Sequence, residues 1–134
     1  MTGIQRATVY FDGACPLCRR EIAHYAARDR AGLLSFADIA ADPAPLAAIG
    51  VGREDALARL HVRLEDGSVL VGARAFAAIW DRLPRWRVLA RALRALPGAM
   101  ALAEAAYRVV ARNRTRVVAT LCARVLVMHD QHPR

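Results

Sequence analysis

Residues 7–39 read ATVYFDGACPLCRREIAHYAARDRAGLLSFADI, and this stretch decides the fold. It begins with β-branched and aromatic residues followed by an Asp-Gly pair, which predicts a buried strand over 7–11 that ends in a tight turn. From Pro16 to about Arg30 apolar residues recur at helical spacing, and one face of the predicted helix carries Cys18, Ile22 and Tyr25. Residues 33–39 predict a second short strand. The two cysteines therefore lie at the strand-to-helix junction of a strand, helix, strand unit.

A hairpin follows this unit. Residues 40–52 contain prolines and glycines and predict a loop with one helical turn, and residues 53–60 predict a short helix. Two apolar runs within 60–72 are joined by Asp66-Gly67, which is a strong hairpin signal because both turn residues tolerate positive φ.

The rest of the sequence has helical character. A helix is predicted over 73–83, with Pro84 behind it and one face formed by Phe76, Ile79, Trp80 and Leu83. From about residue 85 to 134 we expect a helical C-terminal extension. Its apolar run, 117–128, is shorter than the roughly 20 residues that span a bilayer, so we expect no transmembrane segment.

Composition bounds the class of protein. With 134 residues, of which 56% are hydrophobic, the chain suits one compact domain, and we expect a single domain over residues 1–134. Its three cysteines are too few for a disulfide framework. The N-terminus has no apolar segment of signal-peptide length, so we expect a cytoplasmic protein. In that reducing compartment a Cys-x-x-Cys pair is typical of catalysis or metal binding rather than of structure.

The net charge of +8 raises the question of a nucleic-acid or membrane partner. All twenty basic residues are arginine, and they are spread from Arg6 to Arg134, so no single stretch accounts for the charge. We therefore do not expect nucleic-acid binding as the main role.

The cysteine pair has the spacing of a redox dithiol. With Cys15 at the helix cap and Cys18 one turn along, the two sulfurs can approach bonding distance. Pro16, at the first helical position, costs no hydrogen bond. The N–H groups of the first turn and the helix dipole favour a thiolate, which lowers the expected pKa of Cys15 from about 8.5 toward roughly 3.5 to 7.5. Arg19 and Arg20 add positive charge nearby.

The expected roles of the residues follow from these positions. Cys15 is the predicted nucleophile, and Cys18, expected to lie deeper, is the predicted resolving thiol. Asp12 has two interpretations that the sequence weighs equally: it accepts the Cys18 proton, or it only shapes the turn by capping nearby N–H groups. Gly13 is expected to permit either positive φ or close packing.

Two alternatives to redox chemistry stay open. A structural zinc site needs four ligands, and one Cys-x-x-Cys supplies two. The candidates to complete it form no second pair of recognisable spacing; they are Cys122, His24, His61, His129 and His132. The two cysteines could also be small core residues, as we expect for Cys122. His24 lies off the Cys15 direction of the helix and is expected to be a solvated or rim residue rather than a catalytic base.

Three segments together resemble the DCC family of thiol-disulfide oxidoreductases: YFDGACPLCRRE at 10–21, LHVRLEDGSVLVGARAFAAIW at 60–80 and YRVVARNR at 107–114. The family is named for an Asp followed by two cysteines, here Asp12, Cys15 and Cys18. The resemblance implies a thioredoxin-like fold and a redox role. It departs from thioredoxins near residue 60, where their cis-proline is replaced by ALARLHV at 56–62, so we expect Leu60 or His61 near the sulfurs instead. The segment 107–114 has no predicted chemical role: Tyr107, Val110 and Ala111 should pack while its arginines face water.

The sequence thus predicts an α/β, thioredoxin-like three-layer domain with a small mixed sheet. The predicted function is dithiol-disulfide exchange without a bound cofactor or metal. Its expected partners are a disulfide-containing protein or small thiol substrate and a reductant that recycles the dithiol. The alternative is a non-catalytic basic binding module whose cysteines are structural or hold zinc.

Overall fold

The structure is a computed structural model of the chain, and it describes residues 5–113. Its sheet has four strands, β1 (Ala7–Phe11), β2 (Leu34–Asp38), β3 (His61–Leu64) and β4 (Val69–Val71), in the order β2-β1-β3-β4. β1 is parallel to β2 and antiparallel to β3, and β3 is antiparallel to β4. The mixed sheet and all four strands are those that the sequence predicts.

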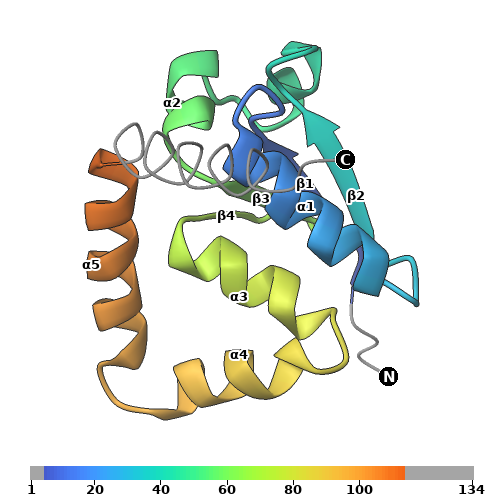
Figure 1. Cartoon of the computed structure of the whole chain (residues 1–134). Helices are drawn as coiled ribbons and strands as arrows, with labels where there is room; N and C mark the ends of the chain where they lie inside the picture. Colours follow the sequence, from blue (N-terminus) through green and yellow to red (C-terminus); the bar gives the residue numbers. More distant parts are fainter. Residues whose placement is uncertain (1–4, 114–134) are drawn as a thin grey trace, which may run out of the picture.

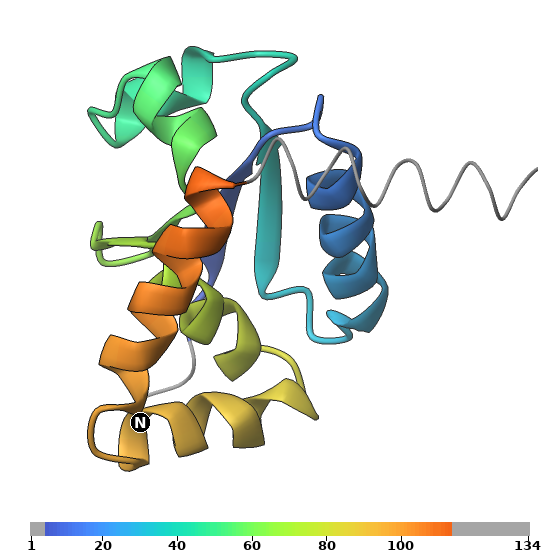
Figure 2. The same cartoon turned by 60° about the vertical axis from the view of Figure 1, so that its left-hand side comes forward.

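The alternation of side chains along the strands produces two cores, one on each face of the sheet. Val9 and Val62 are fully buried on one face, where they pack with residues of α1 (Pro16–Arg28) and α3 (Ala73–Asp81). Tyr10 points to the other face and packs with Ile39 and with residues from η1 (Ala44–Ala48) and α2 (Arg53–Ala58). Figure 2 shows α1 and α2 on opposite sides of the strands. Helices, sheet and helices form three layers, as expected for a thioredoxin-like fold.

Helix α1 ends at Arg28 rather than near Arg30, and Asp29 explains the earlier end. Its backbone N–H bonds the Tyr25 carbonyl, and its carboxylate accepts the N–H groups of Leu33 and Leu34, both at 2.9 Å. The side chain therefore redirects the chain from the helix into β2.

The hairpin and α3 follow the predicted pattern. Asp66 accepts the Ser68 N–H at 2.8 Å, and Gly67 adopts φ 90°, as the turn requires. Gly72, before α3, has no side chain to cap the helix. Glu104, from α5 (Ala99–Arg112), supplies the cap instead by accepting the Ala73 N–H at 3.0 Å.

Two further helices complete the described chain, and both belong to the predicted extension. α4 (Trp86–Ala95) packs on α3, and Arg94 of α4 forms a two-bonded ion pair with Asp81, with both distances 2.6 Å. α5 then runs along the side of the molecule from α4 toward α2 (Figure 1). The extension is confirmed over residues 85–113, whereas the run 117–128 lies outside the described residues. That the whole chain forms one domain stays a prediction.

Within residues 5–113, no helix combines the length and the apolar character that crossing a bilayer requires.

Candidate functional site

The cysteine pair lies where β1 passes into α1. Cys15 is the N-cap of α1, and its Sγ accepts the backbone N–H of Cys18 at 3.4 Å. Pro16 occupies the first helical position, as predicted. The sequence-based placement of Cys15 at the cap and Cys18 one turn along is confirmed.

The relative exposure of the two cysteines differs from the expectation. Cys15 is only 7% exposed, whereas Cys18 is half-buried, so the prediction that Cys18 lies deeper is wrong. The Cys15 N–H bonds the Asp12 carbonyl at 3.2 Å, and Cys15 Sγ accepts the Cys18 N–H, so the Cys15 side chain lies against the first turn of the helix. Arg19 and Arg20 are exposed, so solvent screens their charge at the sulfurs.

The turn before α1 rests on a carboxylate that the sequence analysis did not single out. Asp38, the last residue of β2, accepts through Oδ1 the N–H groups of Gly13 at 3.0 Å, Ala40 at 3.1 Å and Ala41 at 3.2 Å. A Cβ on Gly13 would lie 1.8 Å from Asp38 Oδ2. Of the two reasons expected for this glycine, close packing is therefore the correct one, because its φ is not positive.

Asp12 is part of the same turn. Its Oδ1 accepts the Ala14 N–H at 3.0 Å, which is the turn-shaping role that the sequence allowed. Asp12 also lines the cavity that contains Cys18. Its second predicted role, as acceptor of the Cys18 proton, stays a prediction.

A mainly apolar cavity of about 120 Å³ lies beside Cys18. Its walls come from β1, α1, the segment 56–60, α3 and α5. Residues far apart in the sequence therefore meet next to one sulfur. The apolar side chains that line it include Phe11, Leu17, Ile22, Leu57, Leu60 and Phe76.

One carboxyl group lies in this apolar cavity wall on α1. Glu21 accepts a hydrogen bond from the Tyr25 hydroxyl at 2.7 Å, and Trp80 Nε1 donates to the same hydroxyl at 3.2 Å. Burial raises the pKa of Glu21 above its ordinary value, and the hydrogen bond from Tyr25 opposes this shift only in part. Burial, followed by the charge of Glu21, also raises the pKa of Tyr25, so this tyrosine stays protonated.

Helix α5 completes the cavity. The Tyr107 hydroxyl accepts the Leu60 N–H at 2.8 Å, and the Tyr107 ring meets the Phe76 ring edge-on at 5.7 Å. Val110 and Ala111 line the cavity too, although Val110 is 50% exposed. Arg108 and Arg112 face water as expected, and Arg114 lies outside the described residues. The segment thus has a definite role, as one wall of the site.

The two residues expected in place of the thioredoxin cis-proline have different positions. Leu60 lines the cavity with Cys18. His61 is buried at 5% exposure in β3, and its Nδ1 is 2.8 Å from the Arg59 carbonyl. Of the two residues expected near the sulfurs, Leu60 is therefore the one that lines the same cavity as Cys18. The described part of the chain contains no cis peptide bond.

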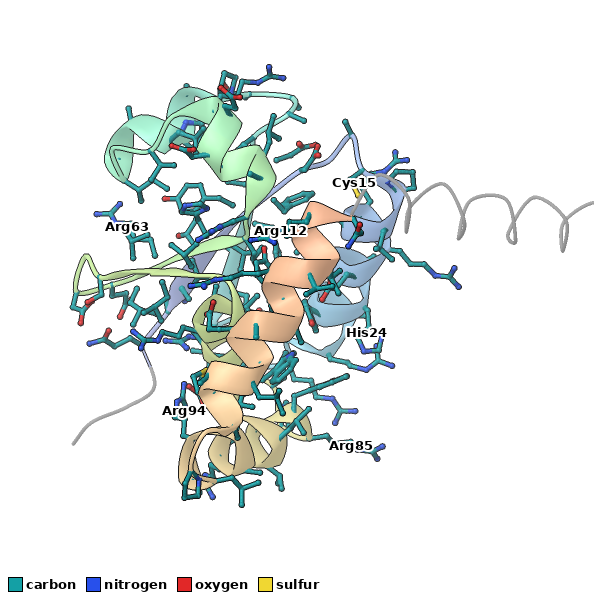
Figure 3. All side chains as sticks on the ribbon, turned by 90° about the vertical axis from the view of Figure 1, so that its left-hand side faces the viewer. Cys15, His24, Arg63, Arg85, Arg94 and Arg112 are labelled. Atoms are coloured by element: carbon teal, nitrogen blue, oxygen red, sulfur yellow. The ribbon has the colours of Figure 1, made fainter. Side chains whose placement is uncertain are left out.

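His24 lies away from the cysteines, near the other end of α1 (Figure 3). Its ring meets that of Trp86 edge-on at 5.7 Å, and His24 does not line the cavity beside Cys18. Residues 5–113 contain no group of three His, Cys, Asp or Glu side chains that could hold a metal ion. The other zinc candidates, Cys122, His129 and His132, lie outside that range.

Arginines of the described residues 5–113 lie on several elements of the fold. The labelled Arg63, Arg85, Arg94 and Arg112 come from different parts of the chain and lie apart in Figure 3. Arg82 is buried at 6% exposure, where its Nε donates to the Gln5 carbonyl at 2.7 Å. At least one of the arginines in residues 5–113 therefore serves the structure of the protein.

A sequence model of DCC1-like thiol-disulfide oxidoreductases matches residues 9–119, which include both cysteines and all the cavity walls. The chain belongs to this family. The mixed four-stranded sheet of this DCC1-like chain is consistent with a thioredoxin-like fold. Membership of the family indicates a thiol-disulfide redox role.

One curated relative of this DCC1-like chain is an uncharacterized chloroplastic protein of Arabidopsis thaliana, At5g50100. The two are 31% identical over 75 residues, which are 54% of this chain and 35% of the relative. The chain therefore corresponds to a minor part of that longer protein. No solved structure matches this DCC1-like chain.

Proposed function

We propose that this protein catalyses dithiol-disulfide exchange, with Cys15 as the attacking thiolate and Cys18 as the resolving thiol. The observation that carries the proposal is the N-cap position of Cys15, whose Sγ accepts the Cys18 N–H at 3.4 Å. N–H groups of a first helical turn and the helix dipole favour negative charge on a sulfur at that position. Electrostatics, rather than exposure, therefore selects Cys15 as the nucleophile.

The reaction is a pair of sulfur-to-sulfur displacements. The Cys15 thiolate attacks a substrate disulfide, so that a mixed disulfide forms, the substrate S–S bond breaks and one substrate thiolate leaves and is protonated. Cys18 then loses its proton and attacks Cys15 Sγ. The Cys15–Cys18 bond forms, the mixed disulfide breaks and the second substrate thiolate leaves. The substrate gains two electrons and the dithiol loses two, so a thiol reductant must return the protein to its starting state.

The partners and the compartment follow from this chemistry. The substrate is a disulfide-containing protein or a small disulfide, and the recycling partner is a thiol reductant. The reducing cytoplasm is the compartment in which that reductant is abundant. In this scheme Asp12 shapes the turn that presents Cys15, through its hydrogen bond with the Ala14 N–H.

The order of the two cysteines can be tested by substitution. Cys15→Ser should abolish reduction of a model disulfide, because it removes the nucleophile. Cys18→Ser should accumulate the mixed disulfide on Cys15, because nothing resolves it, and mass spectrometry of the protein quenched in acid measures this adduct. Cys122→Ser serves as the matched control and should turn over as the wild type does.

Two outcomes would reject the assignment. If the Cys15 and Cys18 variants both retained wild-type turnover, the cysteines would not be the catalytic groups. If the wild type reduced no disulfide and was purified with one zinc ion per chain, the chain would instead be a basic binding module with zinc-binding cysteines.

A further inference from the structure

Glu21 and Cys18 are neighbours on the cavity side of α1. They are three residues apart on a helix, a spacing that brings side chains together on one face, and both line the same cavity. Glu21 is the acidic residue of α1. It lies next to a thiol inside a mainly apolar wall, and its carboxylate accepts a hydrogen bond from the Tyr25 hydroxyl one turn further along the same helix.

The hydrogen bonds around Glu21 determine which of its oxygens can take up a proton. Trp80 Nε1–H can only donate, and it donates to the Tyr25 oxygen, so the single hydroxyl proton of Tyr25 is directed to Glu21 Oε1. Oε1 is therefore an acceptor already in use. A proton that arrives at the carboxylate is placed on Oε2.

The electrostatic setting suits a proton acceptor for a thiol. Cys18 lies in a mainly apolar cavity, and a thiol must lose its proton before it can attack a disulfide, so a base next to Cys18 would speed the resolving step. Burial raises the pKa of Glu21, which brings this carboxylate closer to the pKa of a thiol and makes it a better base than an exposed glutamate.

We infer that Glu21 accepts the Cys18 proton in the resolving step. This inference rests on the proposed function and assigns a residue to its second displacement. The Cys18 S–H bond breaks and its proton moves to Glu21 Oε2, while the Cys18 thiolate attacks Cys15 Sγ and the substrate thiolate leaves. Glu21 then returns the proton to that leaving group, so no further reactant is needed.

Other titratable or charged groups also line the cavity and must be considered as bases or as perturbing charges. They are Tyr10, Asp12, Tyr25, Arg59 and Tyr107. Asp12 is the competing carboxylate; it lies in the turn before α1, where its Oδ1 accepts the Ala14 N–H, whereas Glu21 lies on α1 itself, one turn beyond Cys18. The tyrosines are neutral acids at physiological pH and Arg59 is a cation, so neither type accepts a proton from a thiol.

Rapid mixing of the reduced chain with 5,5′-dithiobis(2-nitrobenzoate) separates the two displacements, in a Cys122→Ser background so that only the site thiols react. The first nitrothiobenzoate release, by Cys15, depends on reagent concentration, and the second, by Cys18, does not. In Glu21→Gln the second phase near pH 7 should slow by roughly tenfold or more, as expected for loss of a general base. The first phase should stay within about twofold of the wild-type rate, since Cys15 does not use this base.

The pH profile separates proton transfer from a structural effect. As the pH rises, a thiol ionises without a base, so the second-phase rate of Glu21→Gln should converge on that of the wild type at high pH. Asp12→Asn should slow this phase less than Glu21→Gln, and Glu65→Gln, an exposed change in the hairpin, should leave it unchanged.

Three results would contradict the inference: an unchanged second phase in Glu21→Gln, a deficit that is the same at every pH, or a larger effect of Asp12→Asn. A wild type that shows no second phase would instead contradict the proposed function itself.

Discussion

The turn before α1 and the cavity beside α1 each contain a carboxylate, and they hold it in opposite ways. In the turn, Asp38 accepts three backbone N–H groups. In the cavity, Glu21 accepts one hydrogen bond, from Tyr25, among largely apolar neighbours. A carboxylate that accepts several backbone N–H groups serves as a fixed support for a turn, whereas burial in a largely apolar wall raises the pKa of Glu21. The difference separates the part of the site that positions the sulfurs from the part that can move a proton.

Gly13→Ala should have the largest effect, because it breaks the support. The new Cβ would lie 1.8 Å from Asp38 Oδ2, so the turn must move and the hydrogen bond from the Gly13 N–H is lost. We expect a loss of about 3 kcal/mol in the free energy of unfolding, measured by urea denaturation.

Two further variants define the cause of that loss. Gly52→Ala adds a methyl group in open space at an ordinary φ, and it should cost less than about 1 kcal/mol because it changes only the N-cap of α2. In an Asp38→Ala background the obstructing carboxylate is absent, so Gly13→Ala should cost much less than in the wild type. Equal costs in the two backgrounds would show that contact with Asp38 is not the reason for the glycine.

Tyr107→Phe should have an intermediate effect, on the wall that α5 contributes to the cavity. It removes the acceptor of the Leu60 N–H while keeping the ring against Phe76. We expect a loss of about 1 kcal/mol in unfolding free energy. Arg108→Ala changes an exposed residue at the next position of α5. It should change the free energy of unfolding by less than about 0.5 kcal/mol, as is typical of exposed substitutions. Equal effects of the two changes would mean that the Tyr107 hydroxyl does not hold α5 in place.

Glu21→Gln should have the smallest effect on stability, visible mainly in its pH dependence. The folded-state pKa of Glu21 lies above the ordinary value of 4.5, so between these two values the folded state binds more protons than the unfolded state. Stability therefore falls as the pH rises through that window. In Glu21→Gln the free energy of unfolding should no longer decrease with rising pH in this window, as measured by unfolding at a series of pH values. Glu65→Gln should retain the decrease. A wild-type slope in Glu21→Gln would mean that Glu21 has no raised pKa.

Local patterns in the sequence predicted most of the fold. The strand at 7–11, the Asp66-Gly67 hairpin and the apolar face of α3 each depend on residues close together in the chain, so period and turn chemistry are sufficient to find them. The early end of α1 was missed because Asp29 stops it by bonding residues of the next strand.

The site was only partly predictable for the same reason. The Cys15 cap is local, and the sequence placed it. Asp38 is 25 residues from Gly13, whose N–H it accepts, and Tyr107 is 47 residues from Leu60, whose N–H it accepts. No local sequence pattern predicts contacts between residues so far apart. Glu21 did have a signal: it lies three residues after Cys18 and four before Tyr25, on the face taken to be apolar, and a charged residue at such a position is worth examining.

The hydrogen bond from Trp80 to Tyr25 also gives the protein an internal optical probe. The chain has two tryptophans, and Trp80 stacks on Trp86 with ring centroids 5.7 Å apart. All of its indole fluorescence therefore originates from one cluster, joined through Tyr25 to the Glu21 carboxylate. The emission spectrum of the unlabelled protein should therefore change when this carboxylate is protonated. Unfolding monitored by this emission should follow the surroundings of Trp80 and Trp86 rather than the turn that contains the cysteines.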